Sequence, residues 1–212
     1  MTLIQIVDVL VPFGRFIDEN KDKKLFSNWG ILVFQVIPFT FFIYWLFRFI
    51  PYVGGLIYFL GLVPLSAYLH IKKNRHKNKK IVLETYLKYL VVVAVGFGGI
   101  WSFIGHTILA DSVASGIGWA TGSPFQTELA FYTLGSGIAG IMAIWFNYEF
   151  LVAIIVTKAV FWYGAAYVHI QDAIVNDNYS KMNIGAPLIG DIILPTVFIV
   201  LIYKIYKTRK PD

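Results

Sequence analysis

Residues 150–170 read FLVAIIVTKAVFWYGAAYVHI, a stretch in which Lys158 is the only side chain charged at neutral pH. A helix of ~20 apolar residues matches the roughly 30 Å hydrocarbon core of a bilayer. This stretch therefore predicts a helix that spans a membrane. The composition of the whole chain agrees, because 58% of its 212 residues are hydrophobic and 14% are charged. A soluble domain has about 25% charged residues.

The composition excludes several classes of protein. Disorder is excluded, because the chain has far more apolar surface than collapse requires. The absence of cysteine excludes a disulfide framework, a thiolate nucleophile and a Cys-ligated metal centre. The formal charge of +6 would by itself suit a nucleic-acid partner, but its distribution along the chain indicates a membrane surface instead.

Six apolar stretches are separated by charged residues, proline or glycine. They predict an all-α fold, a polytopic transmembrane helix bundle of six spans, at about 29–50, 52–71, 86–109, 124–145, 150–170 and 187–206. Residues 1–28 are expected to form an N-terminal cytoplasmic segment with an interfacial helix, because its apolar start is too short to span. Residues 29–206 then form the six-helix transmembrane domain, and residues 207–212 a basic cytoplasmic tail.

Basic residues are distributed unevenly about these spans. Most of the 18 Lys and Arg fall on the side that holds both termini and the loop between the second and third spans. They are Arg15, Lys21, Lys23, Lys24, Lys72, Lys73, Arg75, Lys77, Lys79, Lys80, Lys204, Lys207, Arg209 and Lys210. Because positive loops stay inside, both termini of this multi-pass protein of the cell membrane are predicted to be cytoplasmic. The expected partners are the lipid bilayer and its anionic headgroups, with no nucleic acid, and a homo-oligomer or a membrane complex stays open.

Polar side chains in or beside the spans gather near the opposite, extracytoplasmic face. Ionisable groups are costly to place in a membrane, so each is a functional candidate. At ~100° per residue, Glu128 shares a helix face with Gly135, and His106 shares one with Gly99. Small residues mark where membrane helices approach, so both side chains are expected to point into the bundle. The candidates are His106, Asp111, Gln126, Glu128, His169, Asp172 and Asp191.

Four of these residues form the predicted site. His106, Glu128, His169 and Asp172 combine imidazole nitrogen with carboxylate oxygen. That ligand set suits a divalent metal, Zn²⁺, Mn²⁺ or Fe²⁺, and it can equally pass protons. The alternative is a structural role, in which each histidine donates to a carbonyl and each acid caps a helix.

Lys158 lies inside the fifth span, roughly 12 Å from its cytoplasmic end at 1.5 Å per residue. A lysine at that depth can extend its stem to the interface. We expect Lys158 to do so, or to pair with Glu149 or Glu84, rather than to act in catalysis.

A glycine-rich segment precedes the fourth span. Residues 111–123 carry no Lys or Arg and contain Trp119, which predicts a re-entrant or lid-like turn over the mouth of the bundle. Ser123 is followed by Pro124 and then by Gln126, the order of a helix N-cap with proline at the first helical position. We therefore expect a helix that begins at Pro124, with Ser123 as its cap.

The same region carries a family resemblance. It reads IGW at 117–119 and GSPFQ at 122–126, followed by Glu128 and by Leu134-Gly135. This pattern resembles that of a family of small uncharacterised prokaryotic integral membrane proteins, which carries a domain-of-unknown-function label. The resemblance implies a polytopic membrane fold and makes Gln126 and Glu128 positions of interest. It implies no reaction.

Three functions are consistent with the sequence. The first is a small transporter or permease whose extracytoplasmic polar site handles a divalent metal or protons. The second is a membrane metalloenzyme with the same site, and the third is a structural or accessory subunit of a membrane complex. A transporter needs polar groups across the midplane, and the sequence offers few of them. An enzyme needs a recognisable nucleophile, base or metal set, and the standard hydrolase signatures are missing.

Overall fold

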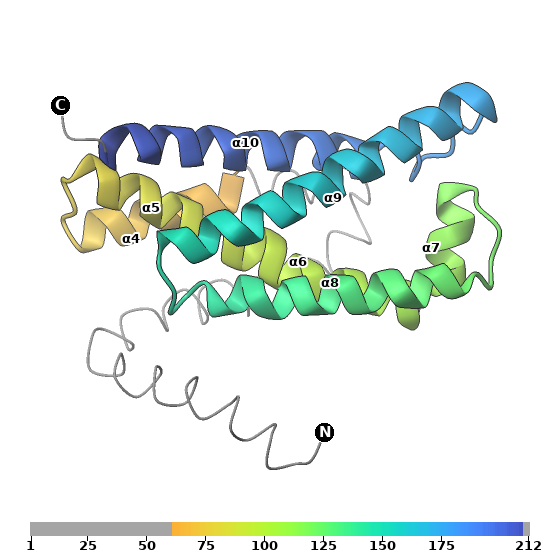
Figure 1. Cartoon of the computed structure of the whole chain (residues 1–212), viewed down its shortest axis with the longest axis horizontal. Helices are drawn as coiled ribbons and strands as arrows, with labels where there is room; N and C mark the ends of the chain where they lie inside the picture. The colour runs from red at the N-terminus through yellow and green to blue at the C-terminus, as the bar shows by residue number, and fades with distance from the viewer. Residues whose placement is uncertain (1–60, 210–212) are drawn as a thin grey trace, which may run out of the picture.

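The computed structural model describes residues 61–209, which consist of helices and their connections with no strand among them (Figure 1). The all-α fold class is therefore confirmed for this part of the chain. The predicted segment 1–28 with its interfacial helix, the first span at 29–50 and the beginning of the second at 52–71 lie outside the described residues. The helices are α4 (Val63–Lys73), α5 (Lys79–Leu90), the π-helix η2 (Val91–Phe97), α6 (Gly98–Thr107), α7 (Ala110–Ile117), α8 (Pro124–Met142), α9 (Tyr148–Val175) and α10 (Ala186–Arg209).

Three helices in residues 61–209 are long and apolar enough to cross a membrane. They are the continuous 29-residue helix Lys79–Thr107, which α5, η2 and α6 form together, the 28-residue α9 and the 24-residue α10. α8 has 19 residues but is not among them. Its first turns carry polar side chains and its middle is rich in glycine, so it is less apolar than the other three. The structure thus supports a membrane protein and does not establish six spans.

The segment before α8 differs from the sequence prediction. Residues Ala110–Ile117 form helix α7, where a glycine-rich turn is predicted. Gly116 is the one glycine inside that stretch, and the chain leaves the helix at Gly118, whose φ of 90° lies in the left-handed region. The irregular part of the segment is therefore confined to residues 118–123.

Glycines let α6 and η2 lie directly against α8. A Cβ atom on Gly99 would lie 2.6 Å from the carbonyl oxygen of Thr133, and one on Gly140 would overlap the backbone of Gly96. Close backbone approach at small residues is how membrane helices commonly pack. Gly135, in contrast, has open space where its Cβ would be, so it lies on a different face of α8.

α9 and α10 pack antiparallel, and α10 also lies against α5. The rings of Trp162 and Phe198 stack with centroids 5.9 Å apart, and the hydroxyls of Tyr163 and Thr196 share a hydrogen bond of 2.9 Å. At one end of the bundle, called the basic end, the α4–α5 turn, the start of α9 and the end of α10 lie together (Figure 1). At the other, called the α7 end, α7 lies between the start of α8 and the end of α9.

Candidate functional site

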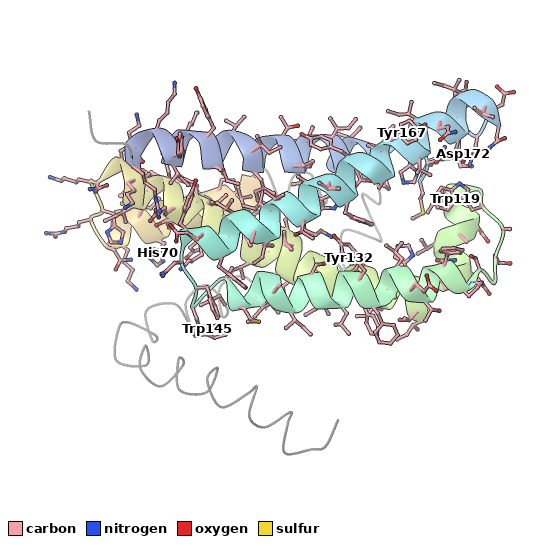
Figure 2. All side chains as sticks on the ribbon, in the orientation of Figure 1. His70, Trp119, Tyr132, Trp145, Tyr167 and Asp172 are labelled. Atoms are coloured by element: carbon pink, nitrogen blue, oxygen red, sulfur yellow. The ribbon has the colours of Figure 1, made fainter. Side chains whose placement is uncertain are left out.

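At the α7 end an indole ring covers an imidazole ring. Trp119, just after α7, stacks on His169 near the end of α9, with ring centroids 5.5 Å apart and 13° between the planes. The indole Nε1 donates a hydrogen bond of 2.8 Å to Oδ2 of Asp172, and Figure 2 shows these two side chains facing each other. His169 is 7% exposed. Its ring is therefore enclosed, although it lies near the end of the bundle.

Two asparagines in the α9–α10 connection complete this arrangement. Oδ1 of the fully buried Asn183 lies 2.7 Å from Nδ1 of His169, and its Nδ2 donates to the carbonyl oxygen of Asn178 at 2.7 Å. Nδ2 of Asn178 donates to Oδ2 of Asp172 at 2.6 Å and to a backbone carbonyl of α7 at 2.9 Å. We call Trp119, His169, Asp172, Asn178 and Asn183 the Trp119 network. It joins α7, α9 and the connection before α10.

Glycine is required where α7 meets this connection. Gly118 has a φ of 90°, and a Cβ there would lie 2.6 Å from Oγ of Ser180 and 2.7 Å from Oδ1 of Asn178. A larger residue would be strained in this backbone conformation and would push the connection away. Gly118 therefore positions Trp119 over His169.

A second network links α6, α7 and α8 at the same end. Nδ1 of His106 lies 3.1 Å from Oε1 of Gln126, and Nε2 of Gln126 donates to the carbonyl oxygen of Ala110 at 3.1 Å. Oδ1 of Asp111 accepts a hydrogen bond of 3.2 Å from the backbone N–H of Gly122. We call His106, Gln126 and Asp111 the His106 network.

α8 begins at Pro124, as the sequence predicts, but the predicted side-chain cap is not formed. Ser123 occupies the N-cap position before Pro124, yet its hydroxyl makes no capping hydrogen bond. Its backbone oxygen accepts from the N–H of Gln126 at 3.1 Å, while the side chain of Gln126 bonds to His106. The predicted capping role of the Ser123 side chain is therefore wrong, and Gln126 bonds to His106 instead of completing a capping box.

The described residues do not bring the four predicted metal ligands together in one group. Glu128 is exposed, because its face of α8 is the one with open space at Gly135 and not the one that meets α6. His106 and His169 belong to separate networks, and both oxygens of Asp172 already accept hydrogen bonds. No group of three or more His, Cys, Asp or Glu within residues 61–209 is placed to hold a metal ion.

Lys158 lies in the interior of the bundle and does not reach the interface. It is 3% exposed, and its Nζ lies 5.4, 4.7 and 4.8 Å from the ring centroids of Tyr132, Phe161 and Trp162. Two of these rings follow it by three and four residues, so the side chain extends toward the α7 end. Asp191 on α10 acts on it electrostatically. The expected partners Glu149 and Glu84 bind another residue instead.

That residue is Arg209, at the end of α10. Its guanidinium contacts Oε1 of Glu84 at 2.8 Å and Oε1 of Glu149 at 2.6 Å, and lies 3.9 Å from the ring centroid of Tyr148. These contacts join α5, α9 and α10 at the basic end. Beside them is a cavity of about 420 Å³, whose lining includes Arg209, both carboxylates and Lys88.

A family model described as "Family of unknown function (DUF6790)" matches residues 55–211. This range includes both networks, Lys158 and the Arg209 cluster, by which we mean Arg209 with Glu84, Glu149 and Tyr148. The chain belongs to this family. No match was found among curated proteins or among solved structures. The expected membership of an uncharacterised domain family is therefore confirmed. The function of this DUF6790 protein is therefore inferred from the arrangement of its own side chains.

Three parts of the site were not singled out by sequence reasoning. The contacts of Trp119 with Asp172, of Asn183 with His169 and of Arg209 with both glutamates join residues 14 to 125 positions apart. Local spacing carries no signal for such pairs. The available hint is compositional, since the DUF6790 chain places three asparagines, Asn176, Asn178 and Asn183, in the short connection that follows α9.

Asp172→Asn is expected to loosen the Trp119 network. The carboxylate accepts from Trp119 and Asn178 at one oxygen and from Asn176 at the other, and an amide would put an N–H₂ against at least one of these donors. The midpoint of thermal unfolding in detergent should fall clearly. Asp177→Asn, on the exposed connection, is the matched control and should leave the midpoint unchanged. Equal midpoints for the two variants would contradict the network.

Proposed function

We propose that this chain is a small membrane permease that moves protons across the bilayer along α9 and α10. The observation that carries the proposal is the burial of Lys158 on α9, beside α10, which carries Asp191; both helices are long enough to span a bilayer. Charged groups inside spanning helices are costly and usually mark ion or proton pathways. Lys158 and Asp191 are ionisable groups between the two ends of the bundle, which a pathway across the membrane needs.

Ionisable groups occur at successive levels along these two helices. On α9, Glu149, Lys158 and His169 are separated by roughly 14 and 17 Å at 1.5 Å per residue. Because α9 and α10 are antiparallel and Asp191 lies in the first turns of α10, Asp191 is nearer the α7 end than Lys158 is. The Tyr163–Thr196 contact places Asp191 close to the level of His169, so the ionisable groups lie at three levels, His169 with Asp191, then Lys158, then Glu149. Groups at both ends and in the middle favour a pathway over a one-sided site.

Asp191 is the group that we propose takes up and releases the proton. When Asp191 is ionised and Lys158 is charged, the pair is neutral. A proton on the Asp191 carboxylate leaves the pair with one net positive charge. The rings of Tyr132, Phe161 and Trp162 lie around the ammonium and favour it in both states. Uptake and release then require little movement of Lys158.

The basic end offers protons an approach to this interior. The cavity of about 420 Å³ is lined by Glu84, Glu149, Lys88 and Arg209, so water entering it meets ionisable groups before the apolar core. Nζ of Lys88 donates to the carbonyl oxygen of Ile144 at 3.2 Å. The cavity therefore extends from the Arg209 cluster toward the connection between α8 and α9.

The proposal includes the topology of the sequence prediction. Six spans place both termini and the α4–α5 turn on the cytoplasmic side, where the basic residues can contact anionic lipid headgroups. Nucleic acid is not a proposed partner, because a basic membrane edge already accounts for the positive charge. Assembly as a homo-oligomer or within a membrane complex is compatible with this topology.

Single cysteines in this Cys-free chain test the orientation. Lys77→Cys, in the α4–α5 turn, should react with an impermeant thiol reagent only from the cytoplasmic side. Tyr179→Cys, in the exposed α9–α10 connection, should react only from outside. Labelling of both cysteines from the same side of intact cells would contradict the topology.

Proton flux tests the function itself. Liposomes that contain the purified protein and a trapped pH-sensitive dye receive an inside-negative potassium diffusion potential. The interior should acidify several-fold faster than in protein-free liposomes, and Asp191→Asn should remove most of this difference because an amide cannot carry the proton. Asp177→Asn, an equally conservative change on the exposed connection, should behave as the unchanged protein.

Two results would contradict the proposal. One is acidification no faster than in protein-free liposomes, when the reconstituted protein is monodisperse and helical. The other is an unchanged flux in Asp191→Asn.

A further inference from the structure

The side-chain amide of Asn183 has a fixed orientation. Its Nδ2 lies 2.7 Å from the carbonyl oxygen of Asn178 and 3.3 Å from that of His169. Carbonyl oxygens only accept, so the N–H₂ must face them and Oδ1 must face Nδ1 of His169, 2.7 Å away. Because Oδ1 also only accepts, the hydrogen of this bond belongs to Nδ1 of His169.

The side-chain amide of Gln126 is fixed in the same way. Its Nε2 donates to the carbonyl oxygen of Ala110, so Oε1 faces Nδ1 of His106 at 3.1 Å. Nδ1 of His106 therefore also carries a hydrogen. Two separate networks, one on α6 and α8 and one on α9 and the following connection, thus hold a histidine in the same tautomer.

This tautomer leaves Nε2 as the acceptor on both rings. A neutral imidazole has a single N–H, and here Nδ1 carries it. Within residues 61–209, no buried side-chain nitrogen or oxygen lacks a hydrogen-bond partner, and no described group bonds to Nε2 of either histidine. Each Nε2 therefore keeps a small exposed surface. Trp119 covers the face of the His169 ring, and its own Nε1 bonds to Asp172 and not to the histidine.

We propose that Asn183 and Gln126 are positioning residues that hold His169 and His106 as Nδ1–H tautomers, so that Nε2 of each receives a proton at the α7 end. A proton that binds to Nε2 gives an imidazolium, and loss of the same proton restores the neutral ring. The use of this site in transport rests on the proposed function. The tautomer itself rests only on the two amide orientations.

Nitrogen-15 NMR of the histidine side chains tests the assignment. The full chain has four histidines, His70, His76, His106 and His169, so ¹⁵N-histidine labelling in lipid nanodiscs gives a simple spectrum. At a pH of about 8, where free imidazole is neutral, His106 and His169 should each show a protonated Nδ1 and an unprotonated Nε2. A protonated Nε2 on either neutral ring in the unchanged protein would overturn the proposal for that residue.

Variants separate positioning from folding. Asn183→Gln keeps an amide with both an acceptor for Nδ1 and a donor for the carbonyl oxygens and should preserve the His169 signature, whereas Asn183→Leu removes the acceptor and should lose it. The His106 signature should stay unchanged in both, which makes it an internal control. An unchanged His169 tautomer in folded Asn183→Leu would show that Asn183 does not set it.

The same variants distinguish this proposal from the proton permease. If Asn183→Leu does not fold, the spectrum of the unchanged protein still decides the tautomer. Loss of proton flux in Asn183→Leu, with retention in Asn183→Gln, would support both. The predicted tautomers in a protein that moves no protons would leave the positioning role standing and contradict the permease alone.

Discussion

Lys158 lies on α9, a helix long enough to cross a bilayer, and its ammonium group is buried inside the helix bundle. Water cannot solvate the charge there. Three aromatic rings from α8 and α9 surround this group, and Asp191 on the neighbouring α10 supplies the opposite charge. An uncompensated buried charge would cost several kcal/mol, so these helices have to stay in register for the fold to persist. The packing of Trp162 on Phe198 and the glycine contacts between α6 and α8 hold the helices that supply this compensation.

The two ends of the bundle are joined by different chemistry. At the α7 end, amides, histidines and the carboxylates of Asp172 and Asp111 form the Trp119 and His106 networks, whose hydrogen bonds fix side-chain orientation. At the basic end, Arg209 binds Glu84 and Glu149 through charge. α9 contributes to both ends and also carries Lys158. Movement of α9 relative to α10 would therefore change the surroundings of His169, Lys158 and Glu149 together.

Sequence reasoning located elements well and contacts poorly. It placed the start of α8 at Pro124, because proline at the first helical position is a local signal, and it identified α9 and α10 from their hydropathy. It chose Gly135 as the contact face of α8, whereas the chain uses Gly137 and Gly140, since several glycines lie on different faces and only packing selects among them. It expected Lys158 to reach the interface, because spacing along α9 brings Phe161 and Trp162 beside Lys158 but does not show that Tyr132 of α8 and the rest of the bundle bury it.

The coupling between Lys158 and Asp191 is the most direct measure of this account. Thermal or chemical unfolding in detergent of the unchanged protein, Lys158→Met, Asp191→Asn and the double variant forms a double-mutant cycle. The account predicts that each single change lowers the free energy of unfolding. The loss in the double variant should be smaller than the sum of the two single losses by about 1 kcal/mol or more. Additive effects would show that the two charges do not interact, and would remove the interior step from the proposed proton path.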